Sequence, residues 1–352
     1  MQDVFAYNPV PVRVVFGYGA SKSLPDEVER LSLKRPIVIC SPARVALGQQ
    51  IAEQVKPAQA HVCDAGLTAM PEESFQRVMA ELESEACDGI IAIGGGSPVG
   101  LLKAATAHSH LPAIAVVTSY SGSEMAANWY TRKGWDQTGG YTPDALPKTV
   151  LYDPELTLGF PAAMSAASGM NAMNHAVESL YSAETNPVVQ DLSEEAIRRL
   201  GSSLPRIVDD PDDREARYDA LYGAWHAAMF RAKQGLSHAI AQRCRSLFDL
   251  VHAESHAVSV PYGVAFNREA APDAMKRIER ALGVDDAARG LYDLNARIGL
   301  ATGYKALGVP DDGLEKAVKV IMAQTFTNPR PVSEDDLREL LRRAFDGVPP
   351  TS

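Results

Sequence analysis

The spacing of apolar residues changes near residue 155, and this change limits the folds that the chain can adopt. Before that point, short runs rich in Val, Ile and Ala alternate with stretches of helical periodicity. Such alternation predicts a doubly wound α/β domain with a mostly parallel sheet. After it, almost every segment has helical periodicity. We therefore predict an α/β dinucleotide-binding domain over 1–155 and an all-helical domain over 156–352, with the binding site in the cleft between them.

The same periodicities locate the individual elements. Strands are expected at 13–17, 36–40, 59–63, 89–95, 113–119 and 149–153. Helices are expected at 24–31, 45–55, 72–85, 165–183, 187–201, 212–231, 234–246, 275–283, 285–299, 312–323 and 333–345, with a further helix after the glycines that follow residue 93. The segment 134–147, rich in Gly, Thr and Asp, is expected to be a loop or hairpin.

Charge and hydropathy exclude several classes of protein. The net charge is −10, with acidic and basic residues interspersed, so no basic stripe is present to bind nucleic acid. The apolar runs are far shorter than the roughly 20 residues of a membrane span. The start of the chain lacks the pattern of a secretory signal, and its four scattered cysteines have no C-x-x-C spacing. These features predict a cytoplasmic globular protein that acts on a small molecule.

Two polar loops follow neighbouring apolar strands. The first is Gly94-Gly95-Gly96-Ser97, where backbone N–H groups and a helix N-terminus would favour a pyrophosphate. It lacks the G-x-G-x-x-G spacing, and a tight turn without a ligand is the alternative. The second is the sequence TSYSGSE at 118–124. Because ligands sit at the carboxyl ends of parallel strands, the two loops together favour a nucleotide site, which Gly17–Gly19 would flank unless it is a plain turn.

Three pairs of polar residues in the second half have i, i+4 spacing: Asn171/His175, His238/Gln242 and His252/His256. Residues four apart lie on one face of a helix, so each pair can direct two side chains into one space. Such pairs frequently build a divalent metal site. Asn171 and Gln242 are amides, however, and amides are poor ligands for a transition metal. The sequence therefore leaves open whether this pocket holds a metal.

Several blocks, in order along almost the whole chain, resemble the iron-containing (group III) alcohol dehydrogenase family and, within it, the maleylacetate reductase group. They are GGGSPVGLLKA at 94–104, TSYSGSEM at 118–125, NAMNHAVESLY at 171–181, FDLVHAESHAV at 248–258 and TNPRPVSEDDLRELL at 327–341. The resemblance implies NAD(P)H in the cleft, a homodimer, and hydride transfer to a conjugated C=C bond of a small dicarboxylate.

The resemblance also implies roles for individual residues. Gly94, Gly95, Gly96 and Ser97 would hold the pyrophosphate, Thr118, Ser119, Tyr120 and Ser123 would contact the phosphates, ribose or nicotinamide, and Leu151 would pack near the cofactor. The family's metal ligands, one Asp and three His, match Asn171, His175, Gln242 and His252. With two amides in this set and no anionic ligand, we expect no resident metal.

The segment 137–142 departs from the reductase pattern, which carries a Lys and an Arg where this chain has Gln137 and Tyr141. Bidentate Arg is a natural carboxylate clamp, so its absence suggests a substrate other than maleylacetate. Tyr120, Tyr141, Asn171 and Gln242 are candidates for binding that substrate. The candidate catalytic residues are His175, His238, His252 and His256, with His252 or His175 as general acid. For each histidine, helix capping or core packing is the alternative.

Three functions fit these observations. The first is an NAD(P)H-dependent, metal-independent reductase of a small unsaturated or carbonyl substrate. The second is a non-redox enzyme that uses the histidines for acid–base isomerisation, elimination or cyclisation. The third is a catalytically silent homologue that serves as a binding subunit. The strand at 36–40 ends at Cys40 and is followed by Ser41-Pro42, without an acidic residue to hold a ribose hydroxyl. The sequence therefore does not decide between NAD and NADP.

Overall fold

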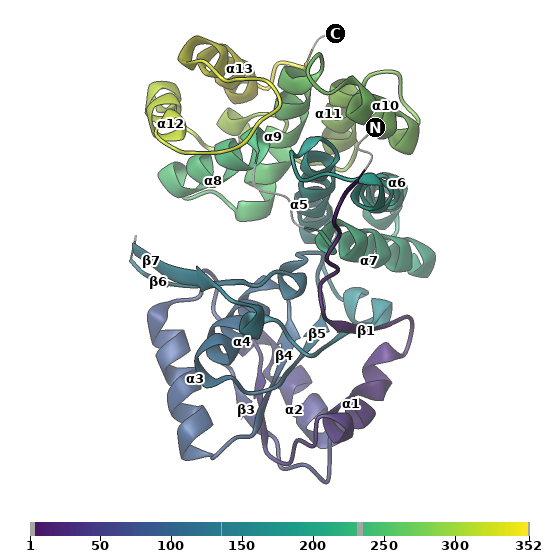
Figure 1. Cartoon of the computed structure of the whole chain (residues 1–352), viewed down its shortest axis with the longest axis vertical. Helices are drawn as coiled ribbons and strands as arrows, with labels where there is room; N and C mark the ends of the chain where they lie inside the picture. The colour runs from purple at the N-terminus through teal and green to yellow at the C-terminus, as the bar shows by residue number, and fades with distance from the viewer. Residues whose placement is uncertain (1–3, 135, 231–234, 351–352) are drawn as a thin grey trace. The chain divides into compact units, whose positions relative to one another are not determined.

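The computed structural model describes residues 4–134, 136–230 and 235–350 (Figure 1). The chain divides into two compact units. One is Val10–Phe160, here called the α/β unit. The other is Pro161–Ser352 together with Met1–Pro9, here called the helical unit. None of the described helices is both long and apolar enough to cross a membrane.

The α/β unit is built on a six-stranded parallel sheet in the order β1-β8-β5-β4-β2-β3. Its strands are β1 (Arg13–Phe16), β2 (Pro36–Ile39), β3 (His61–Cys63), β4 (Gly89–Gly94), β5 (Ala113–Val117) and β8 (Thr149–Tyr152). Its helices are α1 (Leu24–Arg30), α2 (Val45–Gln54), α3 (Glu72–Ser84) and α4 (Gly96–Ser109), with short 3₁₀ turns η1 (Ala20–Ser23), η2 (Pro42–Arg44), η3 (Ser123–Met125), η4 (Pro143–Ala145) and η5 (Pro154–Thr157). The doubly wound fold predicted for this half is confirmed.

Helices cover both faces of this sheet, which explains why its strands are continuous apolar runs. Leu24 and Val28 of α1 and Ile51 of α2 pack in one core cluster with residues of β2, β4, β5 and β8. Helices α3 and α4 cover the other face (Figure 1). Helix α4 is buried along most of its length, so it shows little amphipathic periodicity.

The order of the strands places a switch point between β2 and β4. Helix α2 leads from β2 to β3 in one direction along the sheet, and α4 leads from β4 to β5 in the other. Ligands of open α/β sheets bind at the carboxyl ends of the strands at such a point. The loops after β4 and β5 lie together there, because the Thr118 N–H donates to the Gly94 carbonyl at 3.1 Å.

The segment expected as a loop or hairpin at 134–147 is a longer hairpin that begins earlier. Strand β6 (Asn128–Lys133) pairs antiparallel with β7 (Asp136–Tyr141), and residues 143–145 form η4. Figure 1 shows the hairpin reaching away from the six-stranded sheet. The prediction of its extent was wrong because it relied on the Gly-rich part alone, whereas Trp129, Tyr130 and Thr131 on the first strand are strong β-formers.

The described part of the helical unit contains helices and no strand. They are α5 (Ala162–Tyr181), α6 (Pro187–Asp209), α7 (Arg214–Ala228), α8 (Leu236–Phe248), α9 (His252–Asn267), α10 (Pro272–Leu282), α11 (Ala287–Arg297), α12 (Gly313–Met322) and α13 (Glu334–Asp346), with the 3₁₀ turn η6 (Tyr304–Leu307). An all-helical second half was predicted, but α9 was missed. It is buried from Ser255 to Val264 on every side and contains Pro261, so it has neither an amphipathic stripe nor a helical composition.

A buried carboxylate joins α1 to the edge of the sheet and gives a test of stability. Glu27 accepts hydrogen bonds from Arg13 (2.9 Å), Arg30 (2.7 Å) and Thr149 (2.9 Å). Burial raises the pKa of Glu27, but the bonds from Arg30, Arg13 and Thr149 lower it by more, so its pKa lies below the ordinary value. A lowered folded-state pKa means that the charged form stabilises the fold above the unfolded-state pKa, and that this contribution is lost as the pH falls through the folded-state pKa.

We therefore expect Glu27→Gln to lower the free energy of unfolding by about 1–2 kcal/mol at pH 7, since both arginines are half-exposed and solvent weakens their pairing. At pH 4 the free energies of unfolding of Glu27→Gln and of the unmodified protein should lie closer together than at pH 7. Urea titrations at both pH values measure it. Glu29→Gln, an exposed site on the same helix, is the matched control. An equal loss at both pH values would contradict this explanation.

Candidate functional site

The glycine loop has a backbone that only glycine fits. Gly94 has φ +147°, in the region that side chains avoid, and a Cβ atom there would lie 2.8 Å from Cγ of Pro98. A Cβ atom on Gly95 would lie 2.7 Å from Oγ of Ser119. Gly96 is exposed and begins α4. The loop therefore brings bare backbone and the N-terminus of a 14-residue helix to the carboxyl end of β4, an arrangement suited to a phosphate.

The 118–124 loop is bonded to α4 by a buried lysine that the sequence interpretation missed. Lys103 on α4 is 3% exposed, and its ammonium donates to the Ser123 carbonyl (2.9 Å) and to Oγ of Ser123 (3.2 Å). The Tyr152 hydroxyl donates to Glu124 at 2.7 Å and fixes the end of the loop. A buried ammonium must be paired, so this lysine sets the shape of the loop. Its apolar neighbours in the sequence LLKAA were the available signal.

Four predicted ligand contacts differ in how accessible they are. Thr118 is half-buried, and the buried Oγ of Ser119 has no hydrogen-bond partner among the described residues. Tyr120 is fully buried and packs edge-on against Phe160, with ring centroids 6.0 Å apart. Leu151 is fully buried in the core cluster beside α1 and α2. Both side chains therefore fill the interior, because strand and strand-end residues of a sheet covered on both faces point into packed layers. That Tyr120 contacts a ligand and that Leu151 packs near the cofactor stay predictions.

The Gly17–Gly19 turn is fastened to the same edge of the sheet. Asp153, directly after β8, accepts from the N–H groups of Gly19 (3.1 Å) and Ser21 (3.0 Å) and from the Ser21 hydroxyl (2.6 Å). Asp153 is 1% exposed. The carboxylate therefore closes the turn, and a place for this turn beside a bound nucleotide stays a prediction.

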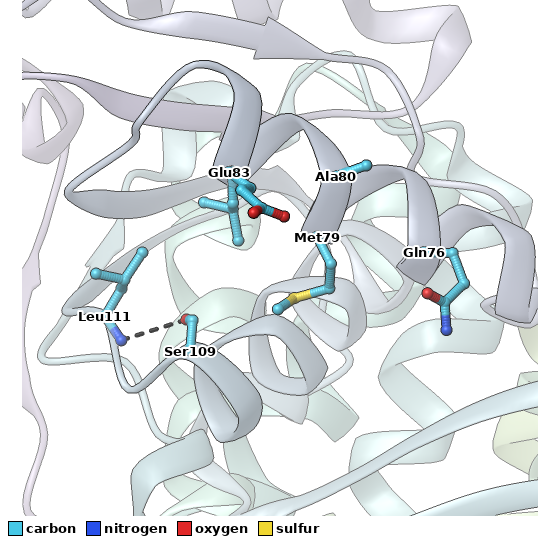
Figure 2. Close-up of a pocket in the computed structure, with 7 residues that line it drawn as sticks. Gln76, Met79, Ala80, Glu83, Ser109 and Leu111 are labelled. Atoms are coloured by element: carbon cyan, nitrogen blue, oxygen red, sulfur yellow. Dashed lines mark hydrogen bonds between the residues drawn. The ribbon is translucent and has the colours of Figure 1, made fainter.

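The cavity in Figure 2 lies elsewhere in the α/β unit. It has a volume of about 490 Å³ and is lined by Gln76, Met79, Ala80, Leu82, Glu83, Ser109 and Leu111. These residues belong to α3, to the last residue of α4 and to the turn after it, where the Leu111 N–H donates to Oγ of Ser109 at 3.3 Å. The glycine loop is at the other end of α4, roughly 20 Å away along a helix of this length. The cavity is therefore not part of the nucleotide site.

In the helical unit, the four predicted histidines form a continuous row. Their ring centroids are 4.5 Å apart for His252 and His256, 4.8 Å for His256 and His238, and 4.4 Å for His238 and His175. Helices α5, α8 and α9 supply them. His238 and His256, in the middle, are 2% and 1% exposed, whereas His252 is exposed and His175 half-buried. The two outer histidines are therefore the ones that a substrate can reach.

A carboxylate that was not predicted anchors one of the two buried histidines in the middle of the row. Glu178 on α5 accepts from Nδ1 of His238 at 2.6 Å, and Nε2 of His238 lies 3.0 Å from Nδ1 of His175. Glu178 also accepts from the N–H groups of Gly235 (2.8 Å), Ser237 (2.7 Å) and His238 (3.2 Å). Burial raises its pKa, but the charge and hydrogen bond of His238 and the backbone donors lower it by more. Glu178 follows His175 by three residues on one helix face, and this spacing was the missed signal.

The other buried histidine, His256, has an amide and no carboxylate as its printed hydrogen-bond partner. Nδ2 of Asn174 donates to Nδ1 of His256 at 2.8 Å, which leaves the proton of a neutral His256 on Nε2. Burial, and then the charges of neighbouring histidines and Arg245, hold the pKa of His256 well below its ordinary value. Nε2 of His256 and Oδ1 of Asn171 are both buried without a partner among the described residues. Nε2 of neutral His256 is therefore a hydrogen-bond donor, and Oδ1 of Asn171 is an acceptor, at the histidine row.

The donor set does not fit a transition metal as it is arranged. Both ring nitrogens of His238 are engaged, one by Glu178 and the other by His175. The Glu178 carboxylate is surrounded by four donors, and Asn171 offers only an amide. Among the described residues, no group of three His, Cys, Asp or Glu side chains converges as metal ligands. Gln242 was expected in this set, but the contacts place His238, one turn earlier on α8, against His175.

The fold and the two loops define a class of protein that has two units. One is a doubly wound α/β unit with a glycine-rich loop between a strand and a helix, and the other is a helical unit with a row of histidines. Sequence comparison is more specific. Residues 11–154 match the family model of iron-containing alcohol dehydrogenases, and residues 165–345 match the model of the C-terminal region of the Fe-containing alcohol dehydrogenase family.

Individual relatives agree with these matches. A maleylacetate reductase of Burkholderia cepacia is 41% identical over 99% of this chain and 100% of its own length. One of Sphingobium indicum is 38% identical over 98% of this chain and 99% of its own length. The crystal structure of maleylacetate reductase from Rhizobium sp. strain MTP-10005 superposes with a TM-score of 0.95 at 35% identity, covering 99% of this chain and 100% of that one. The chain belongs to the iron-containing alcohol dehydrogenase family, and it is an oxidoreductase.

Proposed function

We propose that this protein is an NAD(P)H-dependent reductase that works without a metal. The observation that supports this most strongly is the chemistry of the side chains around the histidine row, where Asn171 offers a neutral amide and the buried Glu178 carboxylate is occupied by the His238 ring and backbone N–H groups. The glycine loop and the 118–124 loop would hold the dinucleotide through Gly94, Gly95, Gly96, Ser97, Thr118, Ser119 and Ser123. When bound, the nicotinamide supplies a hydride.

The chain's own residues supply the proton that a reduction also consumes. His175 and His252 are the accessible members of the row, and one of them would give a proton to a substrate oxygen or carbon. The buried members, His238 and His256, hold the accessible rings in place. Asn171 would donate or accept a hydrogen bond at the substrate oxygen, as an amide does without a change of charge. This assignment needs no Lewis acid.

We propose a small unsaturated or carbonyl compound other than maleylacetate as the substrate. Gln137 and Tyr141 on the exposed strand β7 carry no charge, and Tyr141 is 80% exposed. The cations of this hairpin are Arg132 and Lys133 on β6, which face Gln137 and Asp136 across the strands. On the described strands of this hairpin, a substrate carboxylate would therefore meet Arg132 and Lys133 beside polar and acidic neighbours, without the Lys and Arg that the reductase pattern has in place of Gln137 and Tyr141. Maleylacetate is therefore the reference compound, and we expect it to be reduced slowly.

A fluorescence titration with NADH and with NADPH tests the cofactor assignment, carried out after dialysis against EDTA and with the metal content measured. We expect at least one dinucleotide to bind with micromolar affinity, and the rate of reduction of a panel of small enones, aldehydes and keto acids to be unchanged by EDTA. Binding of neither dinucleotide would overturn the redox assignment. Activity that disappears with EDTA and returns with Fe²⁺ or Zn²⁺ would overturn metal independence. Turnover without any dinucleotide would favour acid–base isomerisation or elimination.

We further propose that the protein acts as a cytoplasmic homodimer, an expectation that rests on resemblance to the family alone. Sedimentation velocity at micromolar concentration measures the mass directly.

A further inference from the structure

We propose that Arg44 binds the 2′-phosphate of NADPH, so that the protein prefers NADPH to NADH. This inference deepens the proposed function and rests on it. Arg44 is the last residue of η2, in the short segment between β2 and α2, and its side chain is exposed. The two dinucleotides differ only in the phosphate on the adenosine ribose. A residue that distinguishes them must therefore act on this group, and in doubly wound folds an arginine near the ribose accommodates it.

The segment after β2 lies beside the glycine loop. Strands β2 and β4 are neighbours, with Ile39 paired to Ala92, so both end at the same edge of the sheet. The Gly66 N–H donates to the Cys40 carbonyl at 2.9 Å, and a Cβ atom on Gly66 would lie 2.9 Å from Cγ of Pro98, in the first turn of α4. Because a dinucleotide lies across the sheet at its switch point, a pyrophosphate on the glycine loop directs one of the two ribose rings over the end of β2.

The guanidinium of Arg44 is directed to the side of β2 on which β4 lies. It donates to the Gly159 carbonyl at 3.5 Å. The next residue, Phe160, packs against Tyr120, which follows β5. Since β4 lies between β2 and β5 in the sheet, a side chain that reaches from the end of β2 to this segment extends along the carboxyl edge toward β4. The cation is therefore on the side where the ribose would lie.

The surroundings of Arg44 favour an anionic partner. Its bond to the Gly159 carbonyl is long and goes to a neutral acceptor, so the guanidinium gains by turning to a charged one. Among the described residues no carboxylate pairs with Arg44, and Asp64, directly after the neighbouring strand β3, is paired with Arg77 at 2.7 Å. Residues 40–43 carry no charge that would repel a phosphate. The end of β2 therefore offers a phosphate a positive charge and offers the 2′-hydroxyl of NADH no carboxylate.

Fluorescence titration of the full-length protein with NADPH and with NADH tests the inference. We expect the Kd for NADPH to be roughly 10- to 100-fold lower, the factor that a hydrogen bond to a charged group supplies. Arg44→Gln should remove this difference by weakening NADPH binding alone, and Arg44→Lys should keep part of it, since it retains the charge but not the bidentate geometry. In the unmodified protein, added salt should weaken NADPH binding more than NADH binding.

Arg35→Gln is the matched control. Arg35 is also exposed, and it donates to a backbone carbonyl, that of Ala86, at 3.1 Å. It precedes β2, at the amino edge of the sheet, so its replacement should change neither Kd. A second pair of probes, 2′,5′-ADP and 5′-AMP, differs by the same phosphate and carries no nicotinamide. The unmodified protein should bind 2′,5′-ADP more tightly than 5′-AMP, and Arg44→Gln should bind the two alike.

Equal affinity of the unmodified protein for NADPH and NADH would overturn the inference, as would an Arg44→Gln variant in which both dinucleotides are weakened alike. In the second case Arg44 would only tie its segment to Gly159, or the nicotinamide half would lie over β2. A preference for NADPH and 2′,5′-ADP that depends on Arg44, in a protein that reduces no compound of the panel, would uphold the inference and overturn the reductase assignment. Binding of none of the four probes would overturn both.

Discussion

Replacement of His175 by glutamine should slow substrate reduction roughly 10²–10⁴-fold, the usual contribution of a general acid. Glutamine can occupy the place of the ring and accept or donate a hydrogen bond, but it cannot release a proton near neutral pH. His175 is the accessible end of the bonded chain from Glu178, so its loss removes the proton donor without emptying the core. Steady-state rates with the best substrate of the panel, and with maleylacetate, measure the effect.

The NADPH Kd of this variant should match that of the unmodified protein, since the residues assigned to the dinucleotide lie in the α/β unit. His226→Gln is the matched control: this histidine is on α7, outside the row, and its Nδ1 bonds the Tyr222 carbonyl at 2.9 Å. The control should retain nearly full activity. A His175→Gln protein that keeps more than about a tenth of the rate would move the general-acid role to His252, the other accessible ring.

Replacement of Gly94 by alanine should weaken dinucleotide binding about tenfold or more. A Cβ atom at φ +147° is strained, at a cost of roughly 1–3 kcal/mol, and it would meet Cγ of Pro98 at 2.8 Å. Relief of this contact must move either the glycine loop or the first turn of α4. About 1.4 kcal/mol corresponds to a factor of ten in Kd. A small displacement of the backbone N–H groups is therefore enough to weaken dinucleotide binding about tenfold. Fluorescence titration with NADPH measures it.

Gly159→Ala is the control within the same unit, because a Cβ atom there has no neighbour within 4 Å. Both variants should be compared at a temperature at which each is folded by circular dichroism. Equal affinity of the two alanine variants for NADPH would show that the glycine loop does not hold the dinucleotide. A loss of NADPH affinity confined to Gly94→Ala would support the assignment.

Much of the fold follows from local patterns. The segments 36–39, 89–94 and 113–117 have no polar side chain, which requires burial on both faces, and the structure has them in the sheet interior. The amphipathic helix α13 begins with Ser333 and Asp336, which form a capping box as their spacing indicates. Helix α9 was missed for the opposite reason: total burial erases the periodicity that identifies a helix.

In the candidate site too, some features follow from local sequence and others only from tertiary packing. Spacing along one helix is a local property, so it identified His175, His238, His252 and His256 as residues that share faces of helices. Contacts between helices are not local. Only the packing of α5, α8 and α9 decided that His238, rather than Gln242, meets His175, and that Glu178 stands behind it. Lys103 became a positioning residue for the same reason, since its partner Ser123 is on a different loop.

The sequence by itself determined the succession of strands and helices, the glycine loop and the family resemblance, because each depends on residues close together along the chain. It did not determine which nitrogens and carboxylates meet, because a one-turn shift of α8 would exchange His238 for Gln242 without altering any local pattern. Tertiary packing made that choice. It buried His238, His256 and Glu178, and it joined His175 and His238, which belong to different pairs, to Glu178 by hydrogen bonds.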